Sequence, residues 1–154
     1  MRLFTILTVL TLGAGSTVLA QDKPADNTAL VLEKLKADKK LLVGDNMGLT
    51  ETEAKAFWPV YDAYQADLGK LNQRTIAMVK TYAASYKSMT DVVAKSLLDE
   101  AIAIERDRVA LLTSYRPKFG AVLSPIKEAR YYQIENKIRA ILNYEMADAI
   151  PLVP

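Results

Sequence analysis

The chain has 154 residues, 20 basic and 18 acidic side chains, and neither cysteine nor histidine. This length favours one domain, and without cysteine no disulfide can stabilise it, so its stability must come from packing. Without histidine, the usual general base near neutral pH and the commonest transition-metal ligand are missing. The balanced charge gives no footprint for nucleic-acid binding.

Residues 1–20 have the pattern of a secretory signal peptide. A basic start at Arg2 precedes an apolar run from Leu3 to Leu12, and Val18 and Ala20 precede a cleavage site. The alternative is a retained membrane anchor, but the run is short for a span and no basic stop-transfer cluster follows it. We therefore expect cleavage after Ala20 and a periplasmic protein without a lipid anchor.

The mature chain is expected to begin with a lead-in and a short helix. Residues 21–27 are polar and predict a flexible lead-in, and residues 28–43 have helical spacing that Gly44 would end. Residues 44–48 predict a turn without the ligand spacing of a calcium loop. The lysines of this helix, Lys36, Lys39 and Lys40, favour a solvated face over a contact with an acidic client or an anionic membrane surface.

The stretch from Leu49 to Met89 predicts one very long amphipathic helix. Thr50 can cap it, and Glu53 can accept a hydrogen bond from the Thr50 amide. Pro59 predicts a bend, because it removes a backbone donor inside the helix. The side chains of its stripe recur at alternating steps of four and three: Phe57, Tyr61, Tyr64, Leu68, Leu71, Thr75, Met78 and Tyr82.

A third helix is predicted after a break at residues 87–91. Thr90 or Asp91 can cap it, it should run to about Tyr115, and Pro117 is expected to bend or interrupt the chain. Its apolar face is wide. One side carries Val93, Leu97, Ala101, Ile104, Leu111 and Tyr115, and beside them lie Leu98, Ile102, Val109 and Leu112.

The last predicted helix starts where Ser124 can act as N-cap and Pro125 can occupy the first helical position. Its stripe consists of Tyr131, Ile134, Ile138 and Ile141. Residues 150–154, Ile-Pro-Leu-Val-Pro, cannot be helical. This apolar tail should either pack back on the helices or offer an extended segment to a partner. Residues 28–154 are thus expected to form one all-α domain, an elongated antiparallel hairpin or bundle of about four helices.

Two short motifs carry a resemblance to a known family. The long helix opens with Leu49-Thr50-Glu51-Thr52-Glu53, and the last helix opens with Leu123-Ser124-Pro125-Ile126-Lys127. This order resembles the Spy and CpxP family of bacterial periplasmic proteins, whose marker is a Leu-Thr-x-x-Gln box at the start of two helices. Here Glu53 and Lys127 replace the glutamines, as in a divergent branch. The resemblance implies a cradle-like antiparallel dimer that holds unfolded clients without ATP or restrains an envelope stress sensor.

The charged residues do not point to an enzyme. Four carboxylates crowd the third helix, at Asp99, Glu100, Glu105 and Asp107, with Lys95, Arg106 and Arg108 close by. Acid–base catalysis needs a pocket, which helices lying side by side rarely enclose, so ordinary surface pairing is expected. We expect no catalytic residue, cofactor or metal.

The aromatic residues allow two interpretations. They can form a surface for a client or partner, for which the candidates are Phe57, Trp58, Tyr61, Tyr86, Tyr131 and Tyr132. They can also form a core, which is preferred for Tyr61, Tyr64 and Tyr82. Because long helices cannot bury two broad stripes within one monomer, some apolar surface should meet a second copy or a client. This predicts a chaperone-like or stress-response protein; the alternative is an adaptor that binds one fixed envelope partner.

Overall fold

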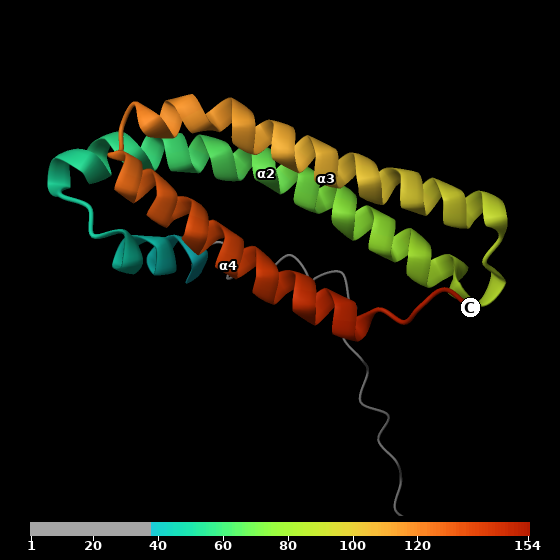
Figure 1. Cartoon of the computed structure of the whole chain (residues 1–154). Helices are drawn as coiled ribbons and strands as arrows, with labels where there is room; N and C mark the ends of the chain where they lie inside the picture. The colour runs from blue at the N-terminus through green and yellow to red at the C-terminus, as the bar shows by residue number, and fades with distance from the viewer. Residues whose placement is uncertain (1–37) are drawn as a thin grey trace, which may run out of the picture. The chain divides into compact units, whose positions relative to one another are not determined.

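The computed structural model describes residues 38–154, and most of these residues are helical. Residues 38–47 are helical, and α2 (Glu51–Ser85), a 3₁₀ turn (Tyr86–Ser88), α3 (Asp91–Gly120) and α4 (Pro125–Ala149) follow. This order confirms the predicted all-α class and helical bundle (Figure 1). The predicted signal peptide, the lead-in and the start of the first helix lie outside the described residues.

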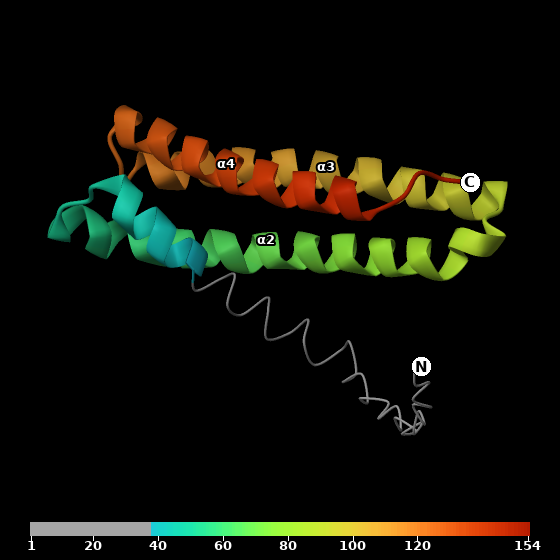
Figure 2. The same cartoon turned by 90° about the horizontal axis from the view of Figure 1, so that it is seen from below.

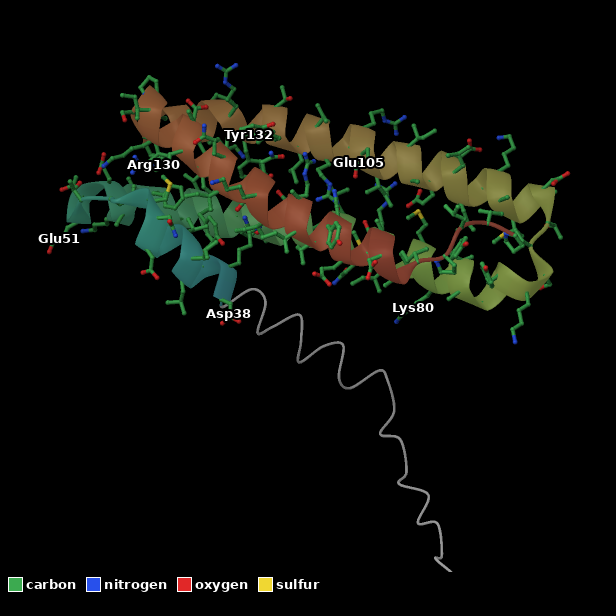
Figure 3. The ribbon with its side chains drawn as sticks, turned by 60° about the horizontal axis from the view of Figure 1, so that its bottom comes forward. Asp38, Glu51, Lys80, Glu105, Arg130 and Tyr132 are labelled. Atoms are coloured by element: carbon green, nitrogen blue, oxygen red, sulfur yellow. The ribbon has the colours of Figure 1, made fainter. Side chains whose placement is uncertain are left out.

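Helices α2 and α3 form an antiparallel hairpin and lie side by side along their length (Figures 1 and 2). Helix α4 starts at the end of α3 and then diverges from it (Figure 1). Glu51 at the start of α2 and Arg130 near the start of α4 lie at one end of the hairpin, and Lys80 lies toward the other (Figure 3).

The start of α2 follows the predicted capping chemistry. The Thr50 hydroxyl accepts a hydrogen bond from the Glu53 amide, and the Glu53 carboxylate accepts one from the Thr50 amide. The predicted stripe is buried from Phe57 to Leu71 and half-buried at its last three positions, Thr75, Met78 and Tyr82. The helix therefore packs most tightly in its first half.

The first helix ends later than predicted. It continues through Gly44 to Met47, so the expected end at Gly44 and the expected turn over residues 44–47 are wrong. Val43 and Met47 lie one turn apart and are both 0% exposed, so the core holds this last turn in place. The chain turns at Gly48 instead, where φ is +57°, a conformation that glycine adopts without steric cost.

Helix α3 is capped by Thr90, as predicted, but it does not stop at Pro117. It continues to Gly120, five residues beyond the predicted end at Tyr115. Tyr115 and Phe119 are both buried, one turn apart on either side of the proline. Their burial outweighs the loss of one backbone hydrogen bond. The predicted start of α4, with Ser124 as N-cap and Pro125 at the first position, is confirmed.

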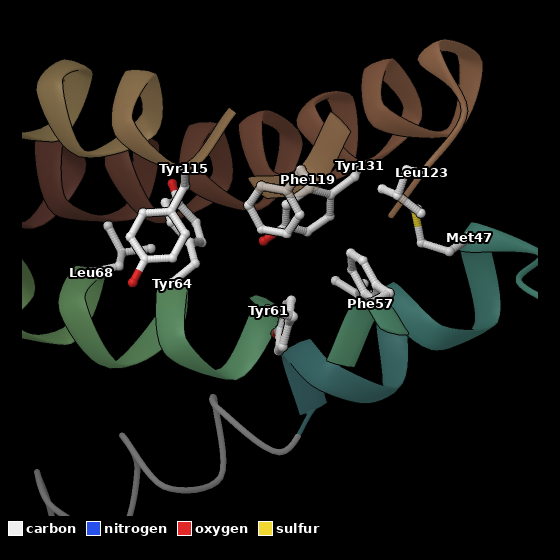
Figure 4. Packing of buried hydrophobic residues seen from close by; sticks show 10 residues of the cluster. Met47, Phe57, Tyr61, Tyr64, Leu68, Tyr115, Phe119, Leu123 and Tyr131 are labelled. Atoms are coloured by element: carbon white, nitrogen blue, oxygen red, sulfur yellow. The ribbon is translucent and has the colours of Figure 1, made fainter. Parts of the chain in front are cut away.

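The core lies at one end of the hairpin (Figure 4). At this end the two capping motifs meet, residues 49–53 at the start of α2 and residues 123–127 at the start of α4. Four segments contribute to the core: residues 38–47, the first half of α2, the end of α3 and the start of α4. Its buried members are Val43, Met47, Phe57, Tyr61, Tyr64, Leu68, Tyr115, Phe119, Leu123 and Tyr131. Six of the eleven aromatic residues within residues 38–154 are thus used in a core of the monomer.

Candidate functional site

Three of the six aromatic residues proposed as a binding surface are core residues. Phe57, Tyr61 and Tyr131 are 0%, 2% and 3% exposed, so they are not available to a client or partner. Phe57 and Tyr131 meet edge to face with 5.3 Å between ring centroids, and Phe119 lies 4.6 Å from Tyr131. Periodicity correctly placed Phe57 and Tyr61 on one face of α2, but that face is covered by α3, α4 and residues 38–47.

Trp58 lies at the edge of this core and is half-buried. The Lys40 ammonium is 5.1 Å from the centre of its ring and also pairs with Asp62 at 2.6 Å. A Cβ at Gly44 would lie 3.6 Å from the Trp58 ring, an ordinary van der Waals contact, so this position of the first helix faces the ring directly. Trp58 therefore anchors residues 38–47 to α2.

Tyr132 and Tyr86 lie outside the core and far from each other along the chain. Tyr132 is exposed on α4 (Figure 3), whereas Tyr86 is half-buried in the turn at the opposite end of the hairpin. Tyr86 contacts the ring of Tyr82 with 5.7 Å between centroids. The six predicted residues therefore do not form one surface.

A polar network closes the side of the aromatic core. Lys39 donates to Gln65 at 2.9 Å and to Glu135 at 2.8 Å, and Gln65 donates to the Tyr131 hydroxyl at 3.3 Å. Burial raises the pKa of the Tyr131 hydroxyl, and burial likewise raises the pKa of Tyr64 to about 12. These hydroxyls stay protonated near neutral pH. The network connects three helical segments: residues 38–47, α2 and α4.

The two capping motifs meet in space. The Lys127 ammonium donates to the Glu53 carboxylate and, at 2.9 Å, to the Gly48 carbonyl. Leu123 is buried and Leu49 packs against the core. Glu53 and Lys127, the last residues of the two motifs, thus form an ion pair that joins the start of α2 to the start of α4. The Lys127 hydrogen bond, followed by that from the Thr50 amide, lowers the pKa of Glu53 to about 2.

The carboxylates of α3 are paired with cations, as the sequence predicted. Arg74 of α2 donates to Glu100 at 2.8 Å and to Asp107 at 2.7 Å, and these bonds lower the pKa of both carboxyl groups. Lys95 pairs with Asp99 at 2.6 Å, and Arg108 lies 3.7 Å from Glu105. The pairs of Arg74 join α2 to α3, whereas the pairs of Lys95 and Arg108 lie within α3.

Within residues 38–154, no group of three or more acidic side chains is arranged to hold a metal ion. The helices of this part of the chain include none that combines the length and the apolar character needed to cross a membrane.

Large apolar side chains are exposed on the outer side of α3. Leu98, Ile102 and Val109, called the α3 stripe here, are 60%, 59% and 61% exposed. Their spacing of four and seven residues puts them on one helix face. The sequence analysis placed these residues beside the first row of apolar residues of this helix. The resulting width of the apolar face was the signal for an exposed stripe.

A second exposed apolar surface lies on the last turns of α4. Every residue from 140 to 149 is exposed, which reflects the divergence of α4 from α3 (Figure 1). The large apolar members, called the α4 patch here, are Ile141, Leu142, Tyr144 and Met146, and they are between 38% and 70% exposed. The predicted α4 stripe therefore holds for Tyr131, Ile134 and Ile138 but ends before Ile141.

Comparison of the chain with known protein families, with curated proteins and with solved structures finds no match. The two exposed apolar surfaces therefore carry the functional interpretation.

Proposed function

We propose that this protein is an exported, ATP-independent holdase that binds apolar segments of unfolded envelope proteins. The observation that carries this function is the α4 patch, four large apolar side chains on a helix end that no other described segment covers. Contiguous exposed apolar surface on a soluble protein marks an interaction site or an aggregation hazard. A helix end without tertiary contacts is also marginally stable, so binding a client would stabilise it.

The chemistry of the patch suits an unfolded client. Its members are a tyrosine, a methionine, an isoleucine and a leucine, which offer both a ring and flexible aliphatic groups. Such side chains bind varied apolar sequences, because the contact depends on shape and area and needs little hydrogen bonding. Asn143 and Glu145 lie between them and Asp148 follows them, and their polarity helps to keep the free helix soluble.

The α3 stripe is proposed as the contact for a second copy. Residues 91–105 carry four acidic and one basic side chain, a net charge of −3, whereas residues 106–120 carry four basic and one acidic, a net charge of +3. Two α3 helices packed antiparallel through Leu98, Ile102 and Val109 would place opposite charges beside each other. Charge complementarity of this kind favours one orientation of a symmetric dimer.

Export to the periplasm is part of the same proposal. It depends on the signal-peptide pattern of residues 1–20, and the resemblance of the two capping motifs to the Spy and CpxP proteins supports it. In that compartment ATP is not the expected energy source, and a binding surface that works by equilibrium affinity is sufficient.

Suppression of aggregation tests the proposed function. The mature chain, at near-stoichiometric amounts, should suppress aggregation of two unrelated denatured proteins. The double variant I141S/Y144S should lose most of this effect. Ile126→Ser is the matched control, because Ile126 is 77% exposed at the other end of α4. Full suppression by the double variant would exclude the α4 patch as the client site. No suppression by the wild type, with capture of one envelope protein, would favour a dedicated adaptor.

A further inference from the structure

The apolar tail, residues 150–154, packs back on the hairpin. The Tyr82 hydroxyl of α2 donates a hydrogen bond of 2.6 Å to the Pro151 carbonyl. The tail therefore crosses from the end of α4 to the end of α2, as the course of the chain shows (Figure 1). The sequence allowed this tail either to pack back on the helices or to offer an extended segment to a partner, and in the structure it packs back.

The tail borders an open groove of about 480 Å³ at the turn between α2 and α3. The groove is lined by the turn and the start of α3, at Tyr86, Lys87, Ser88, Met89, Thr90, Asp91 and Ala94, and by Val153 and Pro154 of the tail. Tyr86 also contacts the ring of Tyr82. The hydroxyl donor and the aromatic wall thus come from α2 and the turn after it, independently of the tail.

Extended proline-containing peptides fit this chemistry. Proline fixes φ and has no N–H, so a segment such as Pro-Leu-Val-Pro is already extended and loses little conformational entropy on binding. Aromatic grooves that offer a hydrogen-bond donor to a peptide carbonyl recognise such segments in other proteins. Tyr82 supplies the donor here and Tyr86 supplies an adjacent ring.

The contact of the tail with Tyr82 and the turn after α2 is weak enough for another peptide to displace the tail. Leu152 and Val153 are 89% and 56% exposed, so neither side chain is enclosed. The last ten residues of α4 are exposed as well and do not press the tail against the turn. A competing peptide would need to displace one hydrogen bond and a partly buried valine.

We propose that Tyr82, Tyr86 and the turn after α2 form a binding site for extended apolar peptides flanked by proline, and that residues 151–154 occupy this site in cis. The site is separate from the α3 stripe and the α4 patch. It does not depend on holdase activity, because its ligand is recognised through a backbone carbonyl and proline geometry.

Peptide binding measured by NMR chemical shifts tests this site. The probe is the blocked peptide Ala-Ile-Pro-Leu-Val-Pro. The receptor is the mature chain carrying P151G/L152G/V153G/P154G. These substitutions keep the length of the tail but remove the side chains and prolines with which it occupies the site. The probe should shift the amides of residues 86–94 with a dissociation constant on the order of 1 mM or below. The wild-type chain should bind it at least about fivefold more weakly, because its own tail competes.

Tyr82→Phe in the glycine-tail chain should weaken binding about fivefold through loss of one hydrogen bond, and Tyr132→Phe, at an exposed tyrosine of α4 outside the proposed binding surfaces, should not. Absence of binding to the glycine-tail chain, or equal binding of Ala-Ile-Gly-Leu-Val-Gly, would overturn the site. If the glycine-tail substitutions abolish self-association of the chain, a second copy's tail fills the site and occupation in cis is overturned.

Discussion

Neighbouring residues with the same side chain can have opposite roles in this protein. Tyr131 is enclosed by Phe57, Phe119 and the Gln65 side chain, whereas Tyr132 is 49% exposed on α4. In a helix, adjacent residues point about 100° apart, so one can be core and the next surface. Substitutions of these two tyrosines therefore distinguish the core interpretation of the aromatic residues from the surface interpretation.

Tyr131→Ala should destabilise the protein by about 3–5 kcal/mol, because it leaves a large cavity among buried rings. Tyr132→Ala should change the free energy of unfolding by no more than about 0.5 kcal/mol. Urea unfolding followed by the fluorescence of Trp58 measures both. Equal effects of the two substitutions would contradict the placement of these side chains.

The ion pair between Glu53 and Lys127 makes a specific prediction about acid. The pKa of Glu53 is about 2 in the folded protein, below its ordinary value of 4.5. Between these values the unfolded chain binds more protons, so this stabilisation is present above pH 4.5 and is lost as the pH falls toward 2. Glu53→Gln should therefore make the urea midpoint fall less steeply than in the wild type over this range.

A double-mutant cycle is the control for this pair. Glu53→Gln and Lys127→Gln should each lower the urea midpoint, and the double variant should lower it by less than both effects added. Additive effects, or parallel pH profiles of Glu53→Gln and the wild type, would show that the pair does not contribute. Other carboxyl groups with lowered pKa values, such as Asp67, are present in both proteins and cancel.

At the level of the helices, two glycines with different backbone roles should respond oppositely to alanine. Gly48 adopts φ +57° after the first helix, so Gly48→Ala should cost about 1 kcal/mol. Gly69 lies inside α2, and a Cβ there would meet nothing within 4 Å. Gly69→Ala should stabilise the protein by up to about 1 kcal/mol. Thermal unfolding measures both changes, and a loss of stability in Gly69→Ala would contradict the open space beside it.

The sequence predicted helix starts and helix faces well, because the signals for both are local. The caps at Thr50, Thr90 and Ser124 and the stripe of α2 were all found, because capping and periodicity depend on residues within one or two turns. The two errors, the predicted helix ends at Gly44 and at Tyr115 before Pro117, have one cause. Buried residues on both sides of each position hold the helix together, and their partners come from distant parts of the chain.

The candidate binding surface was harder to predict than the fold. Periodicity identifies which side chains share a face, but it does not say which face another helix covers. The rings of α2 were covered, whereas Leu98, Ile102 and Val109 were left exposed. The exposure of residues 140–149 follows from the direction in which α4 leaves α3, and no local pattern encodes that direction.

For the whole molecule, the proposed antiparallel dimer predicts how self-association responds to charge. Ile102→Lys places a cation in the middle of the α3 stripe and should shift the mature protein toward monomer in sedimentation equilibrium. Ile126→Lys, on α4, is the matched control and should leave the association unchanged. High salt should also weaken the dimer, because the charges along α3 are exposed. Dimerisation that is unaffected by Ile102→Lys would assign the contact to another surface.

Amide hydrogen exchange of residues 140–149 tests the central claim, that the end of α4 is an uncovered surface for unfolded clients. In the free mature protein these amides should exchange much faster than those of the first half of α2, because every residue of this helix end is exposed. Addition of a denatured client should slow them selectively, while the amides around Ile126 keep their rates. Slow exchange in the free protein, or rates that a bound client does not change, would contradict the account.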